Sequence, residues 1–312
     1  MAGTAAAASV VGLVWVLIAG VPGLQGAAQQ GVLPWSPAPG TQDQYAGTEM
    51  CAMCHPDVAT AFTANSHAGA TMKAGHPAGD ITCEACHGPG LAHADAGGDL
   101  ELVLTSFDGT EGFLVEAKTC LACHAGSREH AYDMVSEHAA AEVSCTQCHS
   151  VHYSETDIGL LKAASPGICY TCHQDVEARF AAAEGHGLGG AHGMNGLLGC
   201  ETCHSPHGSA QNAMLNKTMV NGELCASCHI DKRGPFVYDH PAGTVEGCVA
   251  CHESHGSANR FMLKTQDTLE LCIQCHTGVP ASHNIANPRY RDCTNCHTAI
   301  HGSDTHRLFF RR

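Results

Sequence analysis

Residues 225–257, CASCHIDKRGPFVYDHPAGTVEGCVACHESHGS, contain the pattern that decides the fold of the whole chain. The stretch holds two C-x-x-C-H motifs, which end in His229 and His252. Two further histidines accompany them, His240 between the motifs and His255 three residues after the second. Positions i, i+3 and i+4 of a helical turn lie on one face, so each motif directs two thiols and an imidazole to the same side. C-x-x-C-H is the attachment signature of c-type haem, with the thiols for the porphyrin vinyl groups and the imidazole for the iron.

The motif occurs ten times and uses all 20 cysteines of the chain. A disulfide framework would not place a histidine after every second cysteine, and a zinc site pairs one C-x-x-C with distant ligands. We therefore predict ten covalently bound haem c groups. The predicted attachment cysteines are Cys51, Cys54, Cys83, Cys86, Cys120, Cys123, Cys145, Cys148, Cys169, Cys172, Cys200, Cys203, Cys225, Cys228, Cys248, Cys251, Cys272, Cys275, Cys293 and Cys296. The motif histidines, predicted to bind iron, are His55, His87, His124, His149, His173, His204, His229, His252, His276 and His297.

Composition predicts a haem-cored array rather than a globule. Aromatic residues make up only 5% of the chain, and from Cys51 to Arg312 there are about 26 residues per motif. So short a segment cannot enclose a side-chain core. We expect a mainly irregular, elongated multihaem cytochrome c with short α-helices and almost no β-sheet, built as a linear array of repeats. One short helix is predicted over Asp175–Ala183, with Gly185 as its stop.

The net charge of −15 excludes nucleic acid and anionic lipid surfaces as partners and favours basic or neutral ones.

The chain divides into three expected segments. Residues 1–28 read as a signal peptide with an apolar run over 10–21, although no Lys or Arg precedes Lys73, and an uncleaved anchor is the alternative. Residues 29–48 read as a flexible lead-in and residues 49–312 as the decahaem domain. An exported protein of this kind is expected in the periplasm.

The ten motifs pair into five two-haem units, each with one non-motif histidine inside and another after its second motif. These histidines suit the opposite, distal face of each iron. The predicted distal ligands are His67, His93, His138, His152, His186, His207, His240, His255, His283 and His301. His192 is the alternative to His186, and His76, His130, His192 and His306 are the expected spares. Met214 and Met262 could compete as ligands, but we expect them to pack.

The C-x-x-C-H-x-x-H segments carry a constraint of reach. Two histidines on one iron have Cα atoms about 12–13 Å apart, whereas three extended residues span at most about 11 Å. His255 therefore cannot share an iron with His252, and the same holds for His152 and His207. Each is expected to reach a neighbouring haem, most simply the other haem of its own pair. The argument weakens for His301 and does not apply to His93.

The chain resembles the MtrA/DmsE family of decahaem cytochromes over about residues 49–312. The matching segments are CEACHGPGLAH (83–93), CHSPHGS (203–209), CHIDKRGPFVYDH (228–240), CVACHESHGS (248–257) and CTNCHTAIHGS (293–303). The resemblance implies a periplasmic, bis-histidine electron conduit that enters an outer-membrane β-barrel porin of the MtrB type. It also implies an inner-membrane or periplasmic donor cytochrome and an outer-surface multihaem cytochrome as partners. The spacers 120–138 and 276–293 and the tail 308–312 depart from the pattern.

Three functions compete. The first is this electron conduit associated with the outer membrane, and the second is a soluble periplasmic shuttle or electron store. The third is a multihaem oxidoreductase, which needs an iron with an open position. Because no motif ends in Lys and the non-motif histidines suffice for every iron, we expect no catalytic residue and no enzyme.

Overall fold

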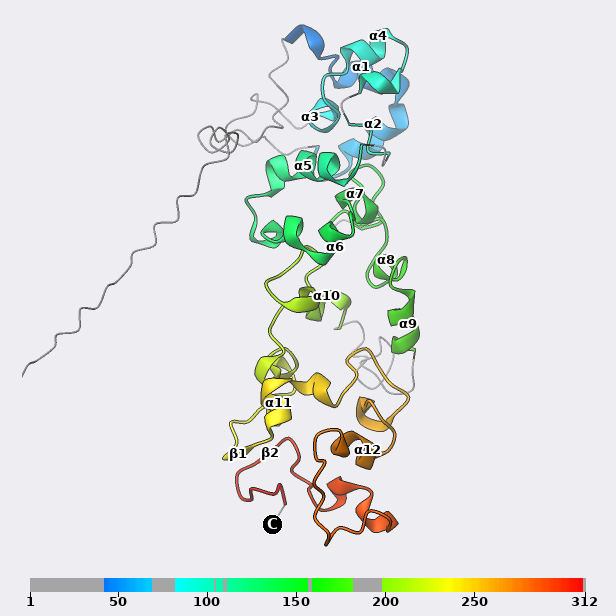
Figure 1. Ribbon diagram of the computed structural model, residues 1–312. Coiled ribbons are helices and arrows are strands. Elements are labelled where there is room, and N and C mark those ends of the chain that lie inside the picture. The colour runs from blue at the N-terminus through cyan, green and yellow to red at the C-terminus, as the bar shows by residue number, and fades with distance from the viewer. Residues whose placement is uncertain are drawn as a thin grey trace, which may run out of the picture.

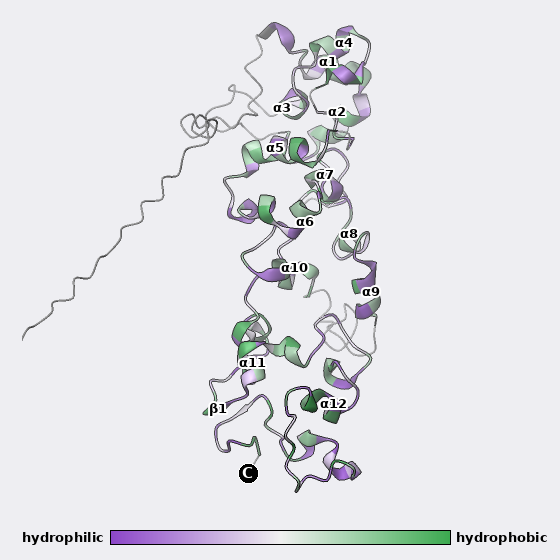
Figure 2. Ribbon diagram, in the orientation of Figure 1, coloured by the Kyte–Doolittle hydropathy of each residue, from purple (hydrophilic) through white to green (hydrophobic). Residues whose placement is uncertain are grey.

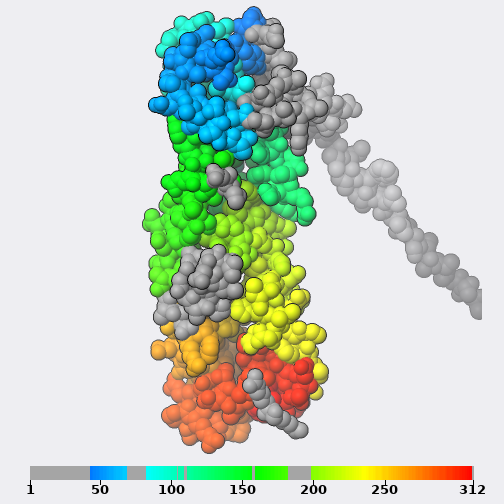
Figure 3. All heavy atoms as spheres, turned by 180° about the vertical axis from the view of Figure 1, so that it is seen from behind, coloured from blue at the N-terminus to red at the C-terminus, as the bar shows by residue number. Residues whose placement is uncertain are grey.

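The computed structural model describes residues 42–68, 82–103, 105–108, 111–156, 159–181 and 198–310. Figure 1 shows a long, narrow molecule in which the first described residues lie at one end and the C-terminus at the other. Helices α5, α6, α10 and α11 follow one edge of the rod, and α7, α8, α9 and α12 follow the other. The view from behind in Figure 3 shows the same elongated form. The predicted linear arrangement agrees with this shape.

The regular elements are short. The α-helices are α1 Thr48–Cys54, α2 Pro56–Thr63, α3 Cys83–His87, α4 Leu91–Asp95, α5 Phe113–His124, α6 Glu137–Ala140, α7 Cys145–Cys148, α8 Gly167–Tyr170, α9 Gln174–Phe180, α10 Cys200–Cys203, α11 Pro241–Val245 and α12 Thr268–Ile273. The 3-10 helices are η1 Gln42–Gln44, η2 Leu100–Leu102, η3 Arg128–His130, η4 Asp133–Val135, η5 Asn212–Met214, η6 Val220–Gly222, η7 Cys225–Ser227, η8 Ile230–Lys232, η9 Cys248–Ala250, η10 Arg260–Met262, η11 Pro288–Tyr290 and η12 Cys293–Asn295.

A single antiparallel pair of two-residue strands, β1 Tyr238–Asp239 and β2 Gly302–Ser303, is the only sheet of the described residues. The prediction of short helices with almost no sheet is confirmed. The helix predicted over 175–183 is α9, which begins one residue earlier, while its predicted stop lies outside the described residues. No helix of the described chain is both long and apolar enough to cross a membrane.

Each motif sits on a helical turn. In eight motifs the histidine N–H donates to the carbonyl of the first cysteine at 2.9–3.0 Å, as His204 does to Cys200. His87 and His124 end helices that contain their own motifs. This i to i+4 bond gathers both thiols and the imidazole on one side of the turn.

The described part of the chain has almost no side-chain core. Its buried hydrophobic residues are Ala117, Leu160, Met262 and Leu269. Figure 2 shows apolar and polar residues mixed along the whole rod instead of a continuous apolar face. So few buried apolar side chains cannot offset the conformational entropy that folding removes, so another apolar group must supply the core.

The last residues of the predicted lead-in are held in place. The buried carboxylate of Glu84 accepts hydrogen bonds from the backbone N–H groups of Ala46 at 2.7 Å and Gly47 at 3.0 Å, and also from Gly90 at 2.8 Å. Residues 46–47 are therefore anchored rather than flexible, while residues 1–41 lie outside the described chain.

Candidate haem sites

The first cysteines of the two motifs in each unit are neighbours. Cys225 and Cys248 share a hydrogen bond, which raises the pKa of Cys225 and lowers that of Cys248 to about 6. The same contact joins Cys51 to Cys83, Cys120 to Cys145, Cys169 to Cys200 and Cys272 to Cys293. Each unit thus brings its two attachment points together, in agreement with the pairing proposed from sequence.

A second set of thiol contacts links one unit to the next. Burial raises the pKa of the Cys203 thiol in the third unit, and the nearby charge of the Cys228 thiolate in the fourth unit raises it further. The corresponding neighbours are Cys86 and Cys123, Cys148 and Cys172, and Cys251 and Cys275. The two kinds of contact alternate, so all ten motifs form one unbroken series along the rod.

Nine motif histidines each face a non-motif histidine among the described residues. His124 has two such neighbours, because the ring of His130 lies 5.4 Å from it in addition to His67. The ring centres lie 5.9–6.4 Å apart in the pairs His55–His93, His67–His124, His87–His152, His138–His173, His149–His207, His204–His255, His240–His276, His252–His301 and His283–His297. Imidazoles on opposite sides of one metal, with bonds of about 2 Å, have ring centres about 6.3 Å apart. The spacing therefore fits an iron between each pair.

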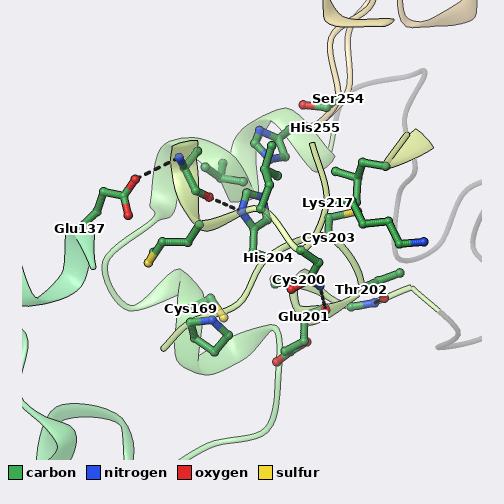
Figure 4. Close-up of a pocket in the computed structure, with 18 of the residues that line it drawn as sticks. Glu137, Cys169, Cys200, Glu201, Thr202, Cys203, His204, Lys217, Ser254 and His255 are labelled. Atoms are coloured by element: carbon green, nitrogen blue, oxygen red, sulfur yellow. Dashed lines mark hydrogen bonds between the residues drawn. The ribbon is translucent and has the colours of Figure 1, made fainter. Parts of the chain in front are cut away.

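Seven of the nine pairs join histidines of neighbouring units in a regular pattern. The histidine inside a unit faces the first motif of the next unit, as His138 faces His173. The histidine after a second motif faces the second motif of the preceding unit, as His255 faces His204 in Figure 4. In the first and fifth units one pair lies within the unit itself, namely His55–His93 and His283–His297.

The reach argument holds for His152, His207 and His255, none of which faces the histidine of its own motif. The expectation that each would serve the other haem of its own pair is wrong, since each faces the preceding unit. His301 behaves in the same way, whereas His93 does face the other motif of its pair.

Second-motif histidines are oriented by backbone carbonyls that the sequence analysis did not find. His204 Nδ1–H donates to Ala213 O at 2.8 Å, and His252 Nδ1–H donates to Phe261 O at 2.8 Å. Equivalent bonds join His87 to Thr105, His149 to Gly159 and His297 to Leu308. Because a carbonyl only accepts, Nδ1 carries the proton and Nε2 keeps the lone pair that a metal needs.

These carbonyls come from strained loops. Ala213 and Met214 have φ of 54° and 51°, and Phe261 and Met262 have φ of 59° and 56°, a region that favours glycine. Glu137 of the preceding unit accepts from the Ala213 N–H at 3.0 Å and holds one loop from across the unit boundary (Figure 4). The methionines belong to these loops, and Met262 is buried. The sequence signal was the Met-Leu pair that begins seven residues after His207 and after His255, with Leu160–Leu161 in the equivalent place after His152.

Burial favours the neutral form of six non-motif histidines. Burial lowers the pKa of His67, His152, His207, His240, His255 and His301. Neutral imidazole is the form that binds a metal, so burial leaves these side chains ready for that role.

A cavity of about 4410 Å³ runs between these side chains and is lined from Tyr45 to His301. A pocket for one small molecule has about 300–1,000 Å³, so this space suits several large groups in series. Its lining includes cysteines and histidines of every unit and apolar side chains such as Phe261 and Leu263.

Two of the expected spare histidines are placed. His130 Nδ1–H donates to Asp133 Oδ2 at 2.6 Å, and the His130 ring lies 4.5 Å, ring centre to ring centre, from His207. It is half-buried rather than solvent-facing. His306 lies 4.8 Å from the ring of Phe310. His76, His186 and His192 lie outside the described residues.

Comparison with known proteins matches this geometry. A family model of the doubled CXXCH motif matches residues 138–178, 192–234 and 240–281, and the model of cytochrome c554 and c-prime matches residues 103–150. The chain is 35% identical over 276 residues to the multihaem cytochrome MtrA of Shewanella baltica, covering 83% of this chain and 79% of that protein.

The chain belongs to the MtrA family of multihaem c-type cytochromes. It therefore binds haem c covalently at its C-x-x-C-H motifs, and the paired thiols, facing imidazoles and long cavity fit that group. The doubled-motif matches begin at residues 138, 192 and 240, each a histidine. Each match joins the second motif of one unit to the first motif of the next. In two of them the first histidine, His138 or His240, faces the last motif histidine of the same match.

Proposed function

We propose that this chain is a decahaem electron conduit in which every iron is held by two histidines. The observation that supports it most strongly is the unbroken series of neighbouring thiols from Cys51 to Cys293, with nine facing imidazole pairs of nearly equal spacing. When bound, haem c supplies a one-electron couple at each site. The chain's residues hold neighbouring attachment points in contact, which keeps successive redox centres close.

The proposed iron ligands are the ten motif histidines with the nine non-motif histidines that face them. The tenth pair joins His229 to a histidine of the third unit. His138 lies seven residues before Cys145 and His240 eight before Cys248, while His192 lies eight before Cys200 and His186 fourteen. The repeat spacing, together with the start of the family match at residue 192, favours His192 over the earlier preference for His186.

The proposed role is electron transfer rather than substrate conversion. In each of the nine pairs the second imidazole occupies the position that an enzyme would leave open for substrate. The neutral state of the buried histidines supports this, since each can bind a metal without first losing a proton.

We further propose that the protein is exported by the segment 1–28 and works in the periplasm at the outer membrane, inside a β-barrel porin of the MtrB type. The family resemblance supports these partners, along with a donor cytochrome and an outer-surface multihaem cytochrome. Apolar and polar residues are mixed along the described part of this acidic rod, without a continuous apolar band (Figure 2), so we expect a protein sheath to carry it across hydrocarbon.

Purification of the native protein tests this proposal. We expect it in the membrane fraction, extracted together with a large β-barrel that is identified by mass spectrometry. Quantitative recovery in the periplasmic fraction with no barrel bound would contradict the conduit and favour the soluble shuttle. Stoichiometric carbon monoxide binding to one haem of the reduced protein would instead favour the oxidoreductase.

A further inference from the structure

The C-terminal residues 301–310 form a strap that returns to the preceding unit. Strand β2 pairs with β1, with Tyr238 opposite Ser303 and Asp239 opposite Gly302. Asp304 Oδ1 accepts a hydrogen bond from the Val237 N–H at 3.1 Å. Gly302 lies so close to Phe236 that an added Cβ would stand 2.0 Å from the ring. The strap is thereby fixed beside His240, the residue after β1.

The strap is a fifth copy of the carbonyl loops. Leu308 O accepts from His297 Nδ1–H at 2.6 Å, as Ala213 O does from His204 and Phe261 O from His252. Ser303 Oγ accepts from the N–H two residues later, as Ser209 and Ser257 do. Phe309 has φ of 59°, in the same left-handed region as Met214 and Met262. From the motif histidine to the accepting carbonyl this copy is two residues longer than those of the third and fourth units. One extra residue lies between His297 and His301 and the other between Ser303 and Leu308.

This copy differs from those of the third and fourth units in its side chains. The first-unit copy also packs an aromatic ring on its motif histidine, with Phe107 5.3 Å from His87. Phe309 and Phe310 occupy the places of Met214–Leu215 in the third unit and Met262–Leu263 in the fourth. Phe310 lies 4.8 Å from the ring of His297 at an interplanar angle of 27°, and Phe309 lies 5.4 Å from the ring of His240 at 68°. The ring of His306 also lies against Phe310, with ring centres 4.8 Å apart.

The two contacts reach two different sites. His240 faces His276 at 6.2 Å, and His297 faces His283 at 6.4 Å. Two adjacent residues of one strap therefore pack against one imidazole at each of the last two sites of the series. A flat ring packed on an imidazole limits its rotation, and the orientation and surroundings of an axial ligand tune the iron that it binds.

We propose that Phe309 and Phe310 are positioning residues that fix the imidazole planes of His240 and His297 and so tune the last two haems of the series. This inference rests on the ligand pairs of the proposed function.

The test uses the intact holoprotein with the double substitution F309M/F310L, which installs the residue types of the fourth unit and keeps the loop. We expect ten haems by mass. We also expect altered low-spin electron paramagnetic resonance g-values and a shifted potentiometric midpoint, confined to at most two tenths of the haem signal. The matched control is V245L in the fourth unit, whose side chain is exposed and does not line the cavity, and it should leave both readouts unchanged.

An unaltered spectrum and midpoint in F309M/F310L would overturn the inference. If that variant loses haem, the single variants F309L and F310L are measured. The expected result is then one altered haem in each, and two wild-type spectra would overturn it. A wild-type protein without bis-histidine low-spin signals would instead refute the ligand pairs of the proposed function, so the two failures are distinguishable.

Discussion

His255 faces His204 of the preceding unit, with ring centres 6.0 Å apart, although it lies only three residues after His252. The same relation joins His207 to His149 and His152 to His87. In the proposed ligand assignment, neighbouring units therefore complete one another's sites, and none of the three interior units is complete alone. Such an array is interlocked by its ligands rather than by a shared side-chain core.

Substitution of one distal histidine should open one iron. In H255A the partner of His204 is lost, so the reduced holoprotein should bind carbon monoxide at one haem in ten, measured by optical difference spectra. H306A is the matched control, because His306 faces Phe310 and no motif histidine at this spacing among the described residues. Equal carbon monoxide binding by the two variants would contradict the assignment.

Truncation separates interlocked units from independent ones. A chain ending at Ser257 keeps eight motifs but loses His301, which faces His252. We expect eight haems by mass, one of which binds carbon monoxide. If each unit supplied its own ligands, all eight would remain six-coordinate and no carbon monoxide would bind.

The tenth pair can be assigned with two matched variants. Because His192 shares the spacing of His138 and His240, H192A should give a carbon monoxide-reactive haem and H186A should behave as the wild type. Resonance Raman spectra of the reduced proteins would report the loss of low-spin iron in H192A. The reverse result would restore His186 as the ligand.

The motifs could be predicted from sequence because attachment chemistry depends on spacing within one helical turn, as in Cys200–His204. The pairing of Cys169 with Cys200 also followed from the repeat. The motif histidine that each distal histidine faces did not follow from the sequence. His207, for example, could reach either neighbouring unit, and only the three-dimensional path of the chain places it opposite His149. The carbonyl of Ala213 was beyond prediction, since its role depends on a left-handed backbone that Ala does not favour.

Gly208 marks the close approach between the second and third units. Its φ is 93°, and an added Cβ would stand 2.8 Å from Tyr132 O and 2.9 Å from the side chain of Ser136. G208A should displace His207 and destabilise the holoprotein by about 1–3 kcal/mol, measured as a lower midpoint of thermal unfolding. G126A is the control, because nothing lies within 4 Å of its added Cβ. Equal midpoints would show that this contact does not hold the units together.

The central claim is that each iron lies between a motif histidine and a histidine of another unit, except at the two ends. An experimental structure of the haem-loaded protein tests it most directly. The account predicts one iron between His204 and His255, another between His252 and His301, and ten haems in one continuous series. A structure with His252 and His255 on the same iron, or with each unit ligated only by its own histidines, would contradict it.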